Sequence, residues 1–234
     1  MGSRGTPSDR GYADFRDLGI KEVKDADDFF SRHSNFDKWL DGKTMSDDEY
    51  DAIKSYTGSE YRGINKALRT PEKFKDNPTS LKYYNEKADK AEKGLDKTKL
   101  NRNLTVYRGA SIKLFGMDKV NYDELKKFEG GKIRDLGFMS ATPFKRASWI
   151  ETDSQGNPKQ DNSVVMLKIN VPKGKGRGAW VNPFSAHGGT WGEKEFLINR
   201  ASVLQIKKIT QSPAGGIEVE VDWVKKDKSN KWDM

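Results

Sequence analysis

The sequence predicts one domain of the α+β class, with a helical N-terminal part and a β-rich core. Its first hundred residues have apolar side chains at helical spacing, with helix caps and stops between them. Later residues form short runs rich in β-branched and aromatic side chains, which is typical of strands. Because no long Pro/Gly/Ser-rich linker divides the chain, we expect a single domain.

The expected domain spans residues 13–226, with the helical part at about 13–100 and the β-rich core at about 101–226. We expect residues 1–12 to be a disordered N-terminal segment and residues 227–234 to be a frayed tail, since chain ends are often poorly ordered.

Helical patterns occupy three stretches of the N-terminal part. Residues 25–42 carry aromatic anchors, and residues 79–94 keep apolar side chains at helical spacing up to Gly94, which we expect to end the helix. Between them, residues 46–71 open with a capping box, a serine followed three residues later by a glutamate. We expect Gly58 to divide this stretch into two helices.

Strand patterns dominate the remainder. A last hairpin is the clearest of them, since its second strand alternates apolar and charged residues. Residues 121–131 should form a helix with its own capping pair, a short helix should run from residue 142 to 149, and residues 151–163 should be a polar loop. The expected strands are residues 104–110, 135–142, 164–172, 194–200, 202–209 and 216–224.

Composition excludes several classes of protein. The chain has no cysteine, which excludes disulfides and thiolate chemistry. Its two histidines cannot by themselves build a histidine-rich metal site, so we expect no metal site. It contains no apolar run long enough to span a membrane and no secretory signal. The net charge of +8 favours acidic partners, and the stretch "KGKGRG" leaves a nucleic-acid-binding module open as an alternative.

Three short segments carry side chains suited to a charged, phosphate-bearing substrate. Arg108, at a strand end beside Gly109, has a planar fork that grips a diphosphate, although a surface ion pair is an alternative. Ser140 and another hydroxyl residue two positions later share a strand face; the alternative is a helix cap. Glu193 and Glu195 also share a strand face, or are ordinary exposed charges at a strand edge.

In this order and after this helical part, the segments resemble the ADP-ribosyltransferases of the arginine–serine–glutamate branch. This branch is typified by the enzymatic components of clostridial binary toxins and by C3-like exoenzymes. Its motifs correspond here to Tyr107-Arg108-Gly109, Ser140-Ala141-Thr142 and Glu193-Lys194-Glu195, and "YTGSEYRGINKALR" resembles the helix that lines the NAD site. The resemblance covers about residues 40–224 and implies a helical part packed on two antiparallel sheets that form an NAD cleft.

The resemblance also implies a role for each matching residue. Glu195 would bind the ribose 2′-hydroxyl and stabilise the positive charge of the reacting sugar, steadied by Ser140. Glu193 would orient and deprotonate the nucleophile, and Trp191 would face the target protein. The residues implied to contact NAD are Tyr56, Tyr61, Asn65, Arg69, Arg108, Gly109, Thr142 and Lys168, the last of which stands where relatives often keep an arginine.

The function implied is NAD-dependent mono-ADP-ribosylation of a protein, with NAD as co-substrate and nicotinamide released. The first glutamate of the pair indicates an arginine acceptor, and actin is a candidate target by analogy with binary toxins. We expect a toxin or effector, secreted or delivered into the cytosol of a target cell. Its delivery by a partner subunit, by fusion to a larger toxin, by a secretion apparatus or by a phage particle stays open. An NAD glycohydrolase, in which water replaces the protein acceptor, stays open as an alternative.

Overall fold

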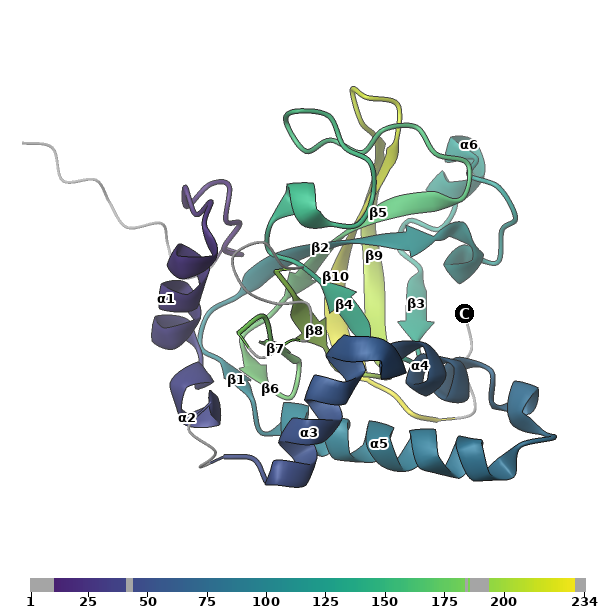
Figure 1. The fold of residues 1–234 in the computed structure, drawn as a ribbon. Helices are drawn as coiled ribbons and strands as arrows, with labels where there is room; N and C mark the ends of the chain where they lie inside the picture. The colour runs from purple at the N-terminus through teal and green to yellow at the C-terminus, as the bar shows by residue number, and fades with distance from the viewer. Residues whose placement is uncertain (1–10, 41–43, 184, 186–193, 230–234) are drawn as a thin grey trace, which may run out of the picture.

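The structure is a computed structural model that describes residues 11–40, 44–183, 185 and 194–229 (Figure 1). Its helices are α1 (Val23–His33), α2 (Phe36–Leu40), α3 (Asp47–Ser55), the π-helix η1 (Tyr56–Glu60), α4 (Tyr61–Arg69), η2 (Pro71–Phe74), α5 (Pro78–Asp96), η3 (Ile112–Phe115), α6 (Tyr122–Lys126) and η4 (Lys145–Ala147). Its strands are β1 (Lys99–Leu100), β2 (Leu104–Ser111), β3 (Lys132–Asp135), β4 (Met139–Ala141), β5 (Val164–Val171), β6 (Gly174–Lys175), β7 (Gly178–Trp180), β8 (Phe196–Ile198), β9 (Ser202–Gln211) and β10 (Ile217–Lys226).

The strands form two main sheets and one small ribbon. One main sheet has five strands in the order β2-β5-β10-β9-β3, the other has three in the order β4-β8-β7, and β1 pairs with β6. Strands β5 and β10 run parallel, whereas the other pairs of the five-stranded sheet are antiparallel. The α+β class and the two main sheets are therefore confirmed, and the larger sheet is mixed because β10 adds to β5 in the same direction.

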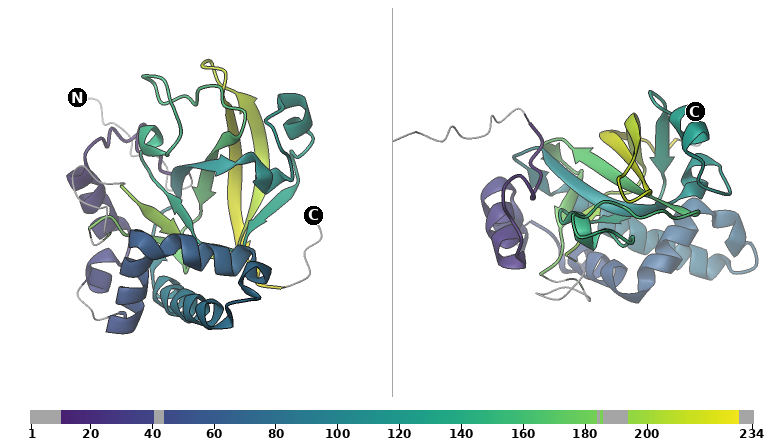
Figure 2. Two further views of the ribbon diagram at one scale, coloured as in Figure 1. Left: turned by 45° about the vertical axis from the view of Figure 1, so that its right-hand side comes forward. Right: turned by 90° about the horizontal axis from the view of Figure 1, so that it is seen from above.

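Helices α3, α4 and α5 pack together at one end of the sheets, and α1 and α2 lie at the side (Figures 1 and 2). One apolar core joins helices and sheets, because the inner faces of α1 and α5 are fully buried together with the apolar face of β5. Phe30 of α1 stacks on Trp180 of β7 with ring centroids 5.0 Å apart. No helix among the described residues is long and apolar enough to cross a membrane.

The predicted division of residues 46–71 is confirmed. Ser46 accepts a hydrogen bond from the Glu49 N–H and its own N–H donates to the Glu49 carboxylate, which completes the capping box of α3. Gly58 has non-helical angles (φ −95°, ψ −121°), so the axis changes direction between α3 and α4. Because of this change of direction, residues on both sides of the kink line the same cavity.

The predicted stop at Gly94 is wrong, since α5 continues to Asp96. A β-carbon at Gly94 would lie 2.9 Å from both Ile53 Cδ1 and Met45 Sδ. This glycine therefore allows close packing against α3 and against Met45, which precedes α3. It does not terminate the helix.

Three predicted strand and helix limits also change. The strand expected over residues 194–200 begins at Phe196, because Lys194 adopts a left-handed conformation with φ 53°. The strand expected over residues 135–142 shortens to β4. The short helix expected up to residue 149 is the single turn η4.

The C-terminal end of β10 is tied to α5 by a cluster of ion pairs. Glu92 is 5% exposed and accepts from Arg200 Nη2 at 2.6 Å, from Lys226 Nζ at 2.6 Å and from Lys228 Nζ. Residues 227–229 of the expected frayed tail thus contribute contacts, and Asp227 N–H bonds the Ala201 carbonyl at 2.7 Å. Residues 230–234 lie outside the described residues.

We predict that Glu92→Gln lowers the free energy of unfolding by about 2–3 kcal/mol near neutral pH, because it leaves three cations without their shared carboxylate. Burial opposes ionisation, but the bonds from Lys226, Lys228 and Arg200 hold the Glu92 pKa at about 2, below its ordinary 4.5. The contribution is therefore present above pH 4.5 and is lost as the pH falls toward 2.

Urea denaturation at about pH 6 and about pH 3 checks this expectation, because the gap between parent and variant should narrow at the lower pH. Glu86→Gln is the control on the same helix, since Glu86 is exposed and forms a loose ion pair with Lys82 at 3.9 Å. Equal effects of the two substitutions would contradict the assigned role of Glu92.

Candidate active site

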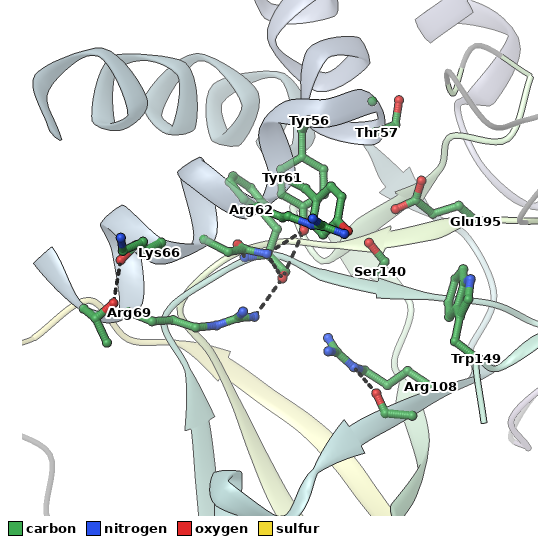
Figure 3. Close-up of a pocket in the computed structure, with 15 residues that line it drawn as sticks. Tyr56, Thr57, Tyr61, Arg62, Lys66, Arg69, Arg108, Ser140, Trp149 and Glu195 are labelled. Carbon is green, nitrogen blue, oxygen red and sulfur yellow. Dashed lines mark hydrogen bonds between the residues drawn. The ribbon is translucent and has the colours of Figure 1, made fainter. Parts of the chain in front are cut away.

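A cavity of about 640 Å³ lies between the helical part and the strands. Side chains from η1 and α4 form one wall, and Arg108 of β2, Ser140 of β4, Trp149 and Glu195 form the facing walls (Figure 3). Its volume lies within the ordinary range for small-molecule sites. The kink at Gly58 and the strands β2, β4 and β8 therefore bring residues far apart in the sequence to one place; Arg108 lies inside β2, which continues to Ser111, and not at a strand end as expected.

Polar side chains of the helical wall bind the chain that enters β4. Asn65, which is 8% exposed, accepts from the Phe138 N–H at 2.9 Å and donates from Nδ2 to the Tyr56 hydroxyl at 2.9 Å. The Tyr56 hydroxyl donates to the Phe138 carbonyl at 3.3 Å. Both predicted NAD contacts thus line the cavity, and their polar groups also fix the segment that carries Ser140.

Arg69 also connects α4 to this segment. Its Nε and Nη2 donate to the two carboxylate oxygens of Asp135 at 2.7 and 2.8 Å, and Nη2 also donates to the Phe138 carbonyl at 3.2 Å. Gly137 leaves the space for these contacts, since a β-carbon there would lie 2.6 Å from Asn65 Oδ1 and 2.8 Å from Arg69 Nε. The charge of Arg69 is therefore compensated within the protein.

Arg108 differs from Arg69 because no carboxylate pairs with it among the described residues. It pairs with Leu167 on the β2–β5 ladder, and its side chain lines the cavity together with side chains of η1 and α4. Its Nε donates to the Gly109 carbonyl at 3.3 Å, and its buried Nη1 has no hydrogen-bond partner among the described residues. Burial lowers the pKa of this guanidinium, which stays charged.

Among the described residues that line the cavity, Glu195 is the acidic one. It is 2% exposed and directly precedes β8, beside Ser140 on β4 (Figure 3). The Tyr56 pKa is raised to about 12 by burial first and then by the charge of Glu195, while hydrogen bonds with Asn65 and Ser140 oppose this rise. Tyr56 thus stays protonated and can donate a hydrogen bond at neutral pH.

Most of the predicted site residues meet in the cavity. Those that line it are Tyr56, Tyr61, Asn65, Arg69, Arg108, Gly109, Ser140 and Glu195. Glu193 and Trp191 lie outside the described residues, so the expected pair of carboxylates is represented in the structure by Glu195 alone.

Two predicted NAD contacts lie away from the cavity. Thr142 is fully buried, forms a bridge with Tyr107, and accepts the Phe144 N–H at 3.2 Å; it does not cap η4, whose N-cap is Phe144 without a side-chain bond. Lys168 pairs with Tyr107 on the ladder and bonds Glu220 at 3.3 Å. Since neighbouring residues of a strand face opposite sides, Lys168 lies on the sheet face opposite to Arg108.

Several lining residues were not predicted: Thr57, Arg62, Lys66, Phe138 and Trp149. Arg62 and Lys66 are four residues apart and each follows a member of the stripe formed by Tyr61 and Asn65. Their helical spacing could therefore have indicated that they lie beside the predicted site residues. Trp149 is 45% exposed and has φ 56°. An isolated tryptophan in an irregular segment carries no periodicity, so no sequence pattern indicates its position.

The donor set of the cavity fits NAD. The unpartnered Nη1 of Arg108 is a buried donor that a diphosphate oxygen would satisfy, since guanidinium groups bind phosphate oxygens strongly. Glu195, Ser140 and Tyr56 supply a carboxylate and hydroxyl groups suited to a ribose. Within the described residues no group of three or more His, Cys, Asp and Glu side chains is placed to hold a metal ion.

Comparison with known proteins gives one consistent result. The family described as ADP-ribosyltransferase exoenzyme matches residues 31–228. Plx2a, an ADP-ribosyltransferase toxin from Paenibacillus larvae, is similar in structure with TM-score 0.63 and 25% identity, over 86% of this chain and 96% of that one. The Clostridium limosum C3 exoenzyme is similar with TM-score 0.68 and 18% identity, over 92% and 98%.

A third solved structure is BECa, an ADP-ribosylating toxin of a binary enterotoxin of C. perfringens, solved with NADH. It is similar with TM-score 0.66 and 20% identity, over 91% of this chain and 50% of BECa. None of the curated protein sequences compared with this chain matched it.

The family match spans most of the chain, and its structural relatives share the arrangement of helices and sheets that builds the cavity. The chain therefore belongs to the ADP-ribosyltransferase exoenzyme family and is an NAD-dependent mono-ADP-ribosyltransferase that acts on a protein.

Proposed function

We propose that this enzyme transfers ADP-ribose from NAD to an arginine side chain of its target protein, with Glu195 as the catalytic carboxylate. The observation that carries the proposal is the convergence of Glu195, Ser140 and Arg108, whose buried Nη1 lacks a partner among the described residues, on one cavity. Arg108 comes from β2, Ser140 from β4 and Glu195 from the residue before β8, and together they supply one donor set for phosphates and one for a ribose.

Bound NAD supplies the ADP-ribosyl group and the nicotinamide that leaves. Glu195 stabilises the positive charge that develops on the ribose as the bond to nicotinamide breaks, because a fixed carboxylate in a buried site interacts strongly with nearby charge. Ser140 holds the carboxylate or the ribose hydroxyl in place, and Arg108 binds the diphosphate. Burial of Glu195 at 2% exposure strengthens its effect by excluding water.

Two findings on relatives support the choice of acceptor and co-substrate. The Vis ADP-ribosyltransferase, similar to this chain with TM-score 0.58 and 19% identity, was solved with agmatine, which carries a guanidinium group. BECa was solved with NADH. Glu193 would deprotonate the acceptor guanidinium, whose own basicity otherwise keeps it charged and unreactive.

Actin is a candidate target, because the chain resembles the enzymatic components of binary toxins, two of which are among its structural matches. We further propose that the enzyme is a toxin or effector that is secreted or delivered into the cytosol of a target cell with a delivery partner. Biotinylated NAD, incubated with the enzyme and cell lysates, identifies the labelled protein and residue by mass spectrometry. Free ADP-ribose without any labelled protein would favour NAD hydrolysis instead.

We predict that Glu195→Gln lowers kcat for nicotinamide release by about 100-fold or more, because the neutral amide cannot stabilise the charge on the ribose. Release of nicotinamide from NAD measures this directly. Glu151→Gln is a matched control, since Glu151 is 85% exposed in its side chain and pairs only loosely with Lys159 at 3.7 Å. Normal release by the Glu195→Gln variant would refute the catalytic assignment.

We predict that Arg108→Lys raises KM for NAD by about 10-fold, because an ammonium group cannot reproduce the two-pronged contact of a guanidinium with phosphate. Steady-state kinetics with NAD as the varied substrate tests this. Lys168→Met is the control, since Lys168 lies on the other face of the same sheet, and its KM should stay at the parent value. A rise in KM for Lys168→Met would restore the role that the resemblance implied for it.

We predict that Glu193→Gln loses transfer to agmatine while keeping a measurable part of NAD hydrolysis, because only transfer requires a base for the guanidinium. Mass spectrometry of ADP-ribosylagmatine and of free ADP-ribose gives the two rates in one reaction. A parallel loss of both rates would contradict a separate role for Glu193.

A further inference from the structure

The chain that leads into Glu195 is held from the neighbouring strand end by two hydrogen bonds. The Lys194 N–H donates to Asn182 Oδ1 at 3.0 Å, and the Val181 N–H donates to the Glu195 carbonyl at 3.0 Å. Asn182 follows β7 and is 1% exposed, so its side chain is part of the interior. The main chain directly before Glu195 is therefore held in place by the buried amide side chain of Asn182.

Lys194 has a conformation that its residue type disfavours. Its φ of 53° places it in the left-handed region, where the β-carbon of an L-residue comes too close to the following carbonyl oxygen. Glycine has no β-carbon and adopts this region readily. Such conformations persist where surrounding contacts enforce them. Here the contacts are the Asn182 bond at the main chain and the Lys194 ammonium, which lies 4.7 Å from the centre of the Phe144 ring.

The left-handed residue decides where the strand begins. Phe196 is paired on both sides, with Ala141 of β4 and with Trp180 of β7, so its position is fixed. An extended Lys194 would continue this strand backward, whereas the observed conformation turns the chain out of the sheet one residue before Glu195. The peptide between the two residues is thereby oriented, and with it the carboxylate that enters the cavity.

We propose that Asn182 is a positioning residue for the transfer reaction, which holds Lys194 in the left-handed conformation and so fixes the orientation of Glu195. This inference rests on the proposed catalytic role of Glu195. It assigns a function to a buried amide that touches neither the cavity nor a substrate. Since small displacements of a catalytic group cost large factors in rate, the expected effect falls on kcat and leaves KM for NAD unchanged.

Two substitutions at one position test the backbone requirement. Lys194→Gly and Lys194→Val both remove the ammonium, but glycine adopts positive φ readily and a β-branched residue does not. We expect kcat for nicotinamide release to be about 10-fold or more lower for Lys194→Val than for Lys194→Gly, with equal KM for NAD. Equal kcat values for the two variants would overturn the inference.

Asn182→Ala tests the amide, measured both in the parent chain and in the Lys194→Gly background. In the parent chain it should lower kcat by about 10-fold or more. In the Lys194→Gly background the loss of kcat should be less than about 3-fold, since glycine adopts positive φ without the hydrogen bond to Asn182. The same loss in both backgrounds, or no loss in either, would overturn the inference. Failure of Asn182→Ala to fold would leave the Lys194 pair to decide the question.

Two controls run in the same assay. Ala201 also has positive φ, 55°, and is buried outside the cavity, so Ala201→Gly should change the melting temperature without changing kcat. Glu195→Gln separates this inference from the proposed function. If that variant is inactive but the Asn182 and Lys194 variants match the parent, only the positioning role fails; if it is active, the catalytic assignment itself fails.

Discussion

The hydrogen bonds between helix α4 and the chain entering β4 are the contacts on which the cavity depends. Asn65 bonds both main-chain groups of Phe138, and Arg69 pairs with Asp135 while also reaching the Phe138 carbonyl. A buried main-chain group that loses its partner costs free energy, so this junction holds the two parts in one relative position. The polar face of α4 is thereby directed at the strands, and its remaining side chains line the space between.

The junction also determines how charge is distributed around the cavity. Arg69 is neutralised by Asp135, whereas Arg108 of β2 has no carboxylate partner among the described residues. Glu195 supplies the negative charge at the start of β8, and this charge contributes to the raised pKa of Tyr56. The cavity is therefore cationic at Arg108 and anionic at Glu195, which is the distribution of charge that the proposed function requires.

Much of the fold and the site could be predicted from the sequence, and the failures have physical reasons. The capping box, the break at Gly58 and the final hairpin depend on neighbouring residues, so local patterns reveal them. The motif residues Arg108, Ser140 and Glu195 do meet in one cavity. Thr142 does not line the cavity, because it is buried in a bridge with Tyr107 and its hydroxyl accepts the Phe144 N–H.

Other features depend on contacts between distant segments, which periodicity cannot show. Lys168 matched a motif position, but the strand register puts it on the face opposite to Arg108. Asn65 and Tyr56 were predicted as NAD contacts, and their bonds to Phe138 become visible only once α4 and β4 are placed together. The left-handed Lys194 likewise interrupts a segment whose residue types favour a strand.

The order of the strands in the larger sheet has a consequence for how the protein is made. Strand β10, the last of the described strands, lies between β5 and β9 near the middle of the sheet. The sheet therefore cannot close on the ribosome until almost the whole described chain has been synthesised. Until then β5 exposes an unpaired edge, so chaperone binding and slow, non-local closure of the sheet are expected during biosynthesis.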